Sequence, residues 1–239
     1  MHSRQIHLTL LFLLLTCKIG SAHYLWVTID PNMGKNGTTN VYFEHGAGPG
    51  DGGYLDPFVS RGKTWIRTVE NIEPKLLKMK EMKTTKHRWL SAGLPHGAPR
   101  SVDSYGKFGV YRYGKTDVLL HYYARNLQVD THEQLHELAR AEHLNLDIVP
   151  HDSAKQMRLQ VLWKGKPVKE TLVYILGPKK FRKNLKTSEN GVVRFNMEHE
   201  GKYFLRTSFE ENTPGKEGDQ KYSLIRHQTT MIMNLPLKK

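Results

Sequence analysis

The sequence predicts an all-β protein made of two antiparallel β-sandwiches, with one short helix in the region that connects them. Two observations favour this class: short apolar runs alternate with polar residues, and glycine, proline or asparagine separates almost every pair of runs. A third observation is Asn190-Gly191, which stands directly before a β-branched run and is typical of a tight hairpin turn. Many short strands with frequent turns are typical of a sandwich.

The first part of the chain has the layout of a signal peptide. Arg4 is followed by an apolar run from Leu8 to Leu15, and Gly20 and Ala22 stand at the −3 and −1 positions of a cleavage site. The run is too short for a permanent membrane span. We therefore expect residues 1–22 to be removed and the protein to be exported, either to the periplasm or into the medium.

An alternative processing site is Cys17, as in a lipoprotein, although Thr16 and Lys18 fit that pattern poorly. Cys17 is the only cysteine in the sequence. Cleavage after Ala22 would therefore leave a chain without disulfides or thiolate ligands.

The amino-terminal domain is expected over residues 23–150. Its alternating runs predict strands over residues 24–29, 40–45, 65–69, 86–90, 108–113 and 117–124. A helix is predicted over 131–143, with Asp130 as its cap and with Leu135 and Leu138 as its apolar stripe.

The second domain is expected over residues 151–239. Its strands are predicted over residues 159–163, 171–176, 192–197, 201–207 and 229–235. The Gly165-Lys166-Pro167 turn, the Thr187 to Gly191 phrase and Gly201-Lys202-Tyr203 resemble the small transthyretin-like or immunoglobulin-like modules of secreted bacterial proteins. This resemblance implies a second β-sandwich.

The net charge of +13 favours anionic partners, such as the acidic polymers of a cell envelope. Nucleic acid is not an expected partner of an exported protein. The acidic residues are scattered, and neither a nucleophilic serine motif nor a catalytic cysteine is present. We therefore expect no enzymatic activity from these features.

Four histidines are placed where they could bind a metal. His23 would become the first residue after cleavage, so that its α-amine and imidazole together could chelate an ion. His45 ends the second predicted strand beside Glu44, His121 lies within a strand, and His227 precedes the last strand. Nickel, cobalt, copper and zinc all accept imidazole ligands. Spacing alone does not say which of these histidines meet.

The predicted helix holds a further motif, His132-Glu133-Gln134-Leu135-His136, which fits the H-E-x-x-H signature of zinc hydrolases. On a helix, the two imidazoles share one face. Ala139 and Glu142 occupy the places where the extended metzincin signature has a glycine and a third histidine. The motif therefore gives a weaker alternative metal site at His132 and His136.

Several phrases of the sequence resemble one family of exported bacterial proteins. They include HYLWV after the cleavage site, VYFEHGAGPGDGGYLDPF and LLHYYAR, followed by LDIVP, VLWKGKPV, TSENGVVRF and YSLIRHQTT. The family is a domain of unknown function, common in planctomycete-like bacteria, that is linked to the periplasmic components of nickel and cobalt uptake systems. The resemblance implies a β-rich protein that captures a divalent metal, with His23 as a ligand and with His121 and His227 as weaker candidates.

Three hypotheses of function follow. The first is a non-enzymatic metal-binding protein that uses His23 to hold nickel, cobalt or copper for a permease or a chaperone. The second is a cell-envelope module that presents a basic surface to anionic polymers and binds no metal. The third is a zinc hydrolase that uses the helix motif.

Overall fold

The structure is a computed structural model that describes residues 23–153 and 156–237. The predicted signal peptide, with its cleavage site after Ala22 and the alternative at Cys17, lies outside the described residues. The elements, in chain order, are β1 (Tyr24–Asp30), β2 (Thr38–Glu44), α1 (Asp56–Arg61), β3 (Lys63–Thr68), β4 (Lys75–Leu76), β5 (Lys80–Lys83), β6 (Arg88–Gly93), β7 (Arg100–Tyr113), β8 (Thr116–Gln128), α2 (His132–Leu138), β9 (Leu146–Ser153), β10 (Gln156–Trp163), β11 (Lys166–Pro167), β12 (Leu172–Leu176), η1 (Pro178–Lys180), β13 (Arg182–Lys186), β14 (Val192–Asn196), β15 (Gly201–Glu211), β16 (Gly215–Glu217), β17 (Gln220–Tyr222) and β18 (Leu224–Leu235).

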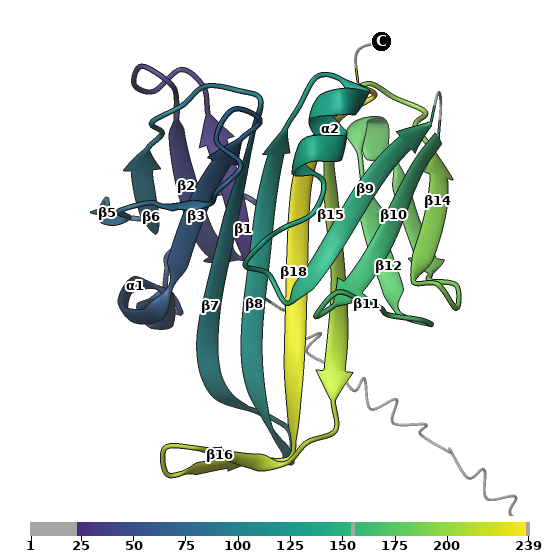
Figure 1. The fold of residues 1–239 in the computed structure, drawn as a ribbon. Coiled ribbons are helices and arrows are strands. Elements are labelled where there is room, and N and C mark those ends of the chain that lie inside the picture. The colour runs from purple at the N-terminus through teal and green to yellow at the C-terminus, as the bar shows by residue number, and fades with distance from the viewer. Residues whose placement is uncertain (1–22, 154–155, 238–239) are drawn as a thin grey trace, which may run out of the picture.

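An eight-stranded sheet of order β13-β12-β15-β18-β8-β7-β3-β4 forms the centre of the molecule (Figure 1). A four-stranded sheet of order β1-β2-β6-β5 packs against one part of it. In a third sheet, β10 pairs with β9 on one side and with β11 and β14 on the other. The third sheet and α2 pack against the remaining part of the central sheet.

The strand β8 contributes to both cores. Leu120, Tyr122 and Ala124 belong to the core under the four-stranded sheet, whereas Tyr123 and Leu127 belong to the core under the third sheet and α2. Successive side chains of a strand point to opposite faces. The two cores therefore lie on opposite faces of the central sheet, and the predicted all-β sandwich fold with a short helix is confirmed.

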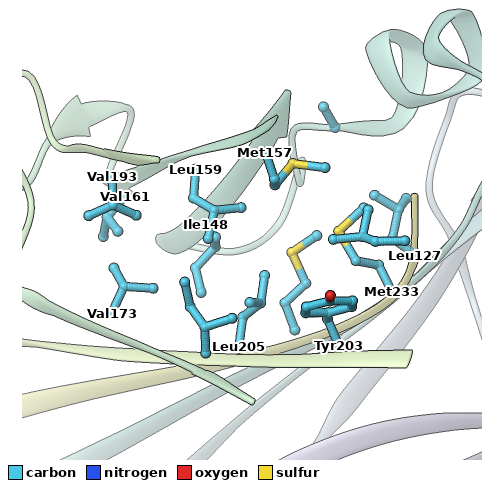
Figure 2. Close-up of a cluster of buried hydrophobic side chains, with 14 of the residues drawn as sticks. Leu127, Ile148, Met157, Leu159, Val161, Val173, Val193, Tyr203, Leu205 and Met233 are labelled. Atoms are coloured by element: carbon cyan, nitrogen blue, oxygen red, sulfur yellow. The ribbon is translucent and has the colours of Figure 1, made fainter. Parts of the chain in front are cut away.

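The larger core fills the space between the third sheet and the central sheet. Figure 2 shows Ile148 and Leu159, from β9 and β10, above Leu205 and Met233, from β15 and β18. All four side chains are at most 1% exposed. Burial of such apolar side chains stabilises the fold by about 1.5–3 kcal/mol each.

One strand pairing differs from the antiparallel prediction. β18 pairs with β8 in parallel, in a register that places His227 opposite His121, and this pairing joins the two halves into one sheet. The alternation of apolar residues shows which face of a strand is buried, but it carries no information about the neighbouring strand or its direction. The sequence pattern therefore could not reveal this pairing.

The division of the chain into two domains stays a prediction. The predicted boundary near residue 150 falls inside β9, and strands from both sides of it share the central sheet.

The helix α2 is shorter than the predicted 131–143. It begins after Thr131, whose hydroxyl accepts a hydrogen bond from the backbone N–H of Gln134 at 3.3 Å, so Thr131 and not Asp130 is the cap. The helix α1 was not predicted from the sequence. None of the helices in the part of the chain that the structure describes has the length and apolar character needed to cross a membrane.

Two buried arginines hold the end of α2. The side chain of Arg125, on β8, is 1% exposed and pairs with Asp103 at 2.9 Å and with Asp147 at 3.3 Å. It also donates hydrogen bonds to the carbonyl oxygens of Leu138 and Ala139. Burial alone lowers the pKa of Arg125, but the two carboxylates outweigh that effect and the net shift is upward.

Arg67, on β3, adds a second cation at the same place. It donates hydrogen bonds to the carbonyl oxygens of Leu138 and Arg140, and it pairs with Glu142 at 3.4 Å. The last carbonyls of a helix lack partners within the helix, and cations there interact favourably with its dipole. These contacts explain why the helix ends at Leu138, since the following carbonyls bond to arginines instead of continuing the helical ladder.

We predict that Arg125→Met lowers the free energy of unfolding by about 3–5 kcal/mol, because it leaves two carboxylates buried without their cation. Urea unfolding followed by circular dichroism measures this change. The control is Arg112→Met, which breaks an exposed pair with Asp117 and should cost little. Equal unfolding midpoints for Arg125→Met and the wild type would contradict the structural role assigned to Arg125.

Candidate metal centres

Three histidines from two elements lie together at one end of the molecule. His132 and His136 come from α2 and His151 comes from β9, and one nitrogen atom from each lies within 4.8 Å of the others. The ring centroids of His132 and His136 are 4.5 Å apart, and those of His136 and His151 are 4.9 Å apart. Within residues 23–153 and 156–237, this is the one group of three such side chains that is close enough to hold an ion.

The local sequence explains why these imidazoles face outward. His132 and His136 are four residues apart and therefore share one face of α2. Leu135 and Leu138, on another face of the helix, are fully buried and fix α2 against the larger core. The side chain of His132 is 45% exposed, so the cluster is open to solvent on one side.

A carboxylate orients one member of the cluster. Nδ1 of His132 lies 2.6 Å from Oδ1 of Asp152, which is the residue after His151. Such a short contact holds the proton on Nδ1 and leaves Nε2 as the donor atom, as is usual for metal-binding histidines. Asp152 thus orients the His132 ring through a hydrogen bond, as carboxylates commonly do for metal-binding histidines.

The surroundings of His151 favour its neutral imidazole. The pKa of His151 is lowered by its burial and, in addition, by the charges that His136 and His132 acquire when they are protonated. Metal ions bind the neutral form of imidazole. Fewer protons therefore have to leave when an ion binds at neutral pH.

Sequence reasoning found two of the three histidines. The metzincin signature has its glycine and its third histidine where this sequence has Ala139 and Glu142. In the structure, the third histidine is His151, which comes from a strand. The sequence offered one hint, which is that His151 directly follows Pro150, the last residue of the connector predicted after the helix. No spacing rule links a helix with a strand that folds back beside it.

The histidine that follows the predicted cleavage site also has a partner. The rings of His23 and His45 have centroids 4.1 Å apart, and Nε2 of His23 is 4.0 Å from Oε2 of Glu44. The pKa of His23 is lowered by burial and then by His45, whereas Glu44 and Asp51 act in the opposite direction.

The loop beside His23 is built around Glu44. The backbone N–H of Gly52 donates a hydrogen bond to Oε1 of Glu44 at 3.1 Å. A Cβ atom at Gly50 would lie 2.2 Å from the carboxyl carbon of Glu44, so a larger residue there would displace the flexible end of that side chain. Glycine at these positions therefore keeps a carboxylate next to His23 and His45.

His121 and His227 form a separate pair, in which His227 is buried and His121 is partly buried. Their ring centroids are 5.0 Å apart, and each Nδ1 contacts a tyrosine hydroxyl, that of Tyr105 for His121 and that of Tyr123 for His227. Nε2 of His227 lies 2.9 Å from Oε1 of Glu211. Both ring nitrogens of His227 and Nδ1 of His121 thus already have partners within the fold.

The four histidines singled out from the sequence therefore form two pairs and not one site. His23 lines the same depression as Leu120 and Tyr122. His121 lies between these two residues on β8, so its side chain points to the other face of the central sheet. The structure brings His23 to His45, and His121 to His227.

Comparisons with known proteins give no function. No protein-family model and no curated protein matches the sequence. A crystal structure of pullulanase complexed with maltotriose from Anoxybacillus sp. LM18-11 is similar at 8% identity and a TM-score of 0.20, over 78% of this chain and 24% of that one. The BSP domain of a biofilm associated protein is similar at 8% identity and a TM-score of 0.21, over 87% of this chain and 51% of that one.

The chain thus spans about a quarter of the first of these structures and about half of the second. Both TM-scores are too low to indicate a shared fold.

We predict that the pair of His121 and His227 makes the fold sensitive to acid. Burial, followed by the charges of His227 and Lys107, lowers the pKa of His121 from 6.5 to about 4. Between these values the unfolded chain binds a proton at this ring and the folded chain does not, so the free energy of unfolding falls as the pH falls from 6.5 to about 4. Urea unfolding at a series of pH values measures this decline.

The control for this prediction is His121→Gln, which removes the titrating ring and should flatten the decline. An identical dependence on pH in His121→Gln and the wild type would show that other groups cause it.

Proposed function

We propose that this chain is an exported, non-enzymatic protein that binds a divalent transition metal through His132, His136 and His151 and passes it to a permease or a chaperone. The observation that carries the proposal is the convergence of three imidazole nitrogens within 4.8 Å of one another.

The distances suit a site that closes around an ion. In a tetrahedral site with metal–nitrogen bonds of about 2.0–2.1 Å, ligand nitrogens stand roughly 3.4 Å apart. The upper limit of 4.8 Å therefore requires movements of about 1 Å, which partly exposed imidazoles achieve by rotating their side chains. The backbones of α2 and β9 can stay where they are.

The ligand set favours a metal that can be exchanged. Three protein ligands leave a coordination position open, unlike the four ligands of a structural zinc site. All three ligands are nitrogens, which suits nickel, cobalt, copper and zinc. An open, partly exposed site lets an incoming ligand from another protein reach the ion, and acidification to about pH 5 releases it by protonating the imidazoles.

The environment of Glu133 favours binding over hydrolysis. A hydrolase with this motif needs the glutamate as a general base. Hydrogen bonds from the backbone N–H of Glu133 itself and from the hydroxyl of Thr131 lower the pKa of this carboxylate. A carboxylate that is stabilised in this way is a weaker base.

The amino-terminal histidine supplies a second part of the proposal. Cleavage after Ala22 would give His23 a free α-amine next to its imidazole, and His45 stands beside it at 4.1 Å between ring centroids. Amine, imidazole and the second imidazole together offer three nitrogen donors. This set favours copper or nickel, which bind nitrogen ligands more tightly than cobalt does.

We predict that His136→Ala and His151→Ala each weaken metal binding at the three-histidine site by about 100-fold or more. Loss of only a residue that hydrogen-bonds to a metal ligand already lowers metal affinity by about 10–100-fold. Isothermal titration of nickel, copper, cobalt and zinc into protein stripped with a chelator measures the affinity and the number of ions bound. The metal affinity of Asp152→Asn should lie between that of the two histidine variants and that of the wild type.

The matched control is His87→Ala, which removes an exposed histidine in the turn between β5 and β6 and should leave binding unchanged. Full retention of bound metal by both His136→Ala and His151→Ala would exclude the site, and with it the zinc-hydrolase hypothesis.

We predict that the exported protein begins at His23 and that His23→Ala removes one copper or nickel site. Amino-terminal sequencing tests the first statement. Titration in the His136→Ala background tests the second, because the three-histidine site no longer contributes there. If Cys17 or another residue comes first, or if His23→Ala binds as many ions as its parent, the amino-terminal chelate does not exist.

A further inference from the structure

Three depressions adjoin one another on the face of the central sheet that carries the four-stranded sheet. The first, of about 370 Å³, is lined by His23, Tyr111 and Tyr113 among others. Tyr113 also lines the second, of about 240 Å³. Tyr174 is shared by the second and the third, which has a volume of about 270 Å³. The shared lining residues place the three depressions in a row, and we call this row the tyrosine–arginine groove.

Tyrosine rings and arginine side chains alternate along this groove. The guanidinium of Arg226 lies 4.9 Å from the ring centre of Tyr113. The guanidinium of Arg206 lies 4.6 Å from the ring centre of Tyr24 and 4.8 Å from that of Tyr174. Tyr113 is the last residue of β7, and Tyr24 and Tyr174 lie on β1 and β12, so the order of the strands produces the alternation. The stacking holds each planar cation in a fixed orientation.

Arg206 has a charge that the protein does not balance. No carboxylate of the described residues lies within ion-pair distance of it, and its Nε is buried without a hydrogen-bond acceptor. A partly buried cation without a partner costs free energy. Binding of an anion beside it would recover that cost.

The charge along the groove is mostly positive. Arg206, Arg226, Arg182 and Lys183 line the second and third depressions, and Glu210 is the only acidic residue among the described residues that line them. Glu210 pairs with Arg226 at 2.6 Å. Arg182 and Lys183 are exposed on β13, the edge strand of the central sheet.

We propose that the tyrosine–arginine groove binds an acidic polysaccharide. The apolar C–H face of a sugar ring stacks on an aromatic ring, whose face carries partial negative charge. The planar fork of an arginine matches a carboxylate, sulfate or phosphate group on the same chain. Ser208 and Gln228 line the groove and supply hydroxyl and amide groups for the hydroxyls of the sugar. A chain with rings and regularly spaced charges fits the alternation of the groove.

The proposal is tested by titrating oligomers of galacturonic acid into the wild type and into Arg206→Ala and Tyr174→Ala. A chelator is present throughout, so that no metal ion can bridge the carboxylates and the histidine cluster. We expect the wild type to bind, and each variant to bind about tenfold or more weakly, as is usual for a central contact in an interface. Arg206→Lys keeps the charge without the planar fork and should be intermediate.

The matched control variant is Arg194→Ala, which removes an exposed arginine from β14, in the third sheet, and should bind as the wild type does. Equal thermal midpoints for all variants establish that they are folded. Two further probes separate ring stacking from charge: the methyl ester of the same oligomer, which has rings without charge, and polyglutamate, which has charge without sugar rings.

Both further probes should bind more weakly than the acidic oligomer, and Tyr174→Ala should weaken the binding of polyglutamate less than it weakens the binding of the oligomer, because polyglutamate has no sugar ring to stack on Tyr174. The proposal is overturned if Arg206→Ala and Tyr174→Ala bind the acidic oligomer as tightly as the wild type does. It is also overturned if polyglutamate binds as tightly as the oligomer, since the groove would then be a general anion-binding surface.

Discussion

The arrangement of the three-histidine cluster depends on the contacts of one buried group, the guanidinium of Arg125. It binds Asp103 on β7, Asp147 on β9 and the last carbonyls of α2 at once. Through Asp147 and the helix carbonyls, one cation of the central sheet fixes both elements that carry His132, His136 and His151. A buried charge is costly unless all its bonds are made, so it tolerates little displacement of its partners.

This constraint separates the rigid from the adjustable parts of the molecule. The ends of α2 and β9 are held by charged contacts and by a packed core, whereas the imidazoles beyond them are partly exposed. An arrangement of this kind keeps the three imidazoles near one another while each ring can still rotate. It differs from the pair of His121 and His227, in which tyrosine and glutamate already bond to three of the four ring nitrogens.

The sequence allowed prediction of features that depend on neighbouring residues. The strands over 24–29 and 40–45, the turn at Gly191 and the helix that carries His132 and His136 follow from local periodicity and turn residues. The parallel pairing of β8 with β18 and the approach of His151 depend on contacts between distant parts of the chain. The burial of Arg125 could not be predicted either, because a charged residue at the end of an apolar run normally marks the point where a strand reaches solvent.

The pairing of β8 with β18 has a consequence for the order in which the molecule assembles. Tyr123 and His227, which touch across this pairing, are 104 positions apart in the chain. Bringing two such distant segments together costs conformational entropy before the contacts between them can form. This pairing is therefore expected to form slowly. Until β18 arrives, β8 has an open edge, so the central sheet is completed only after the last strand of the described chain has docked. The two halves of the sheet are therefore expected to fold separately before this pairing joins them.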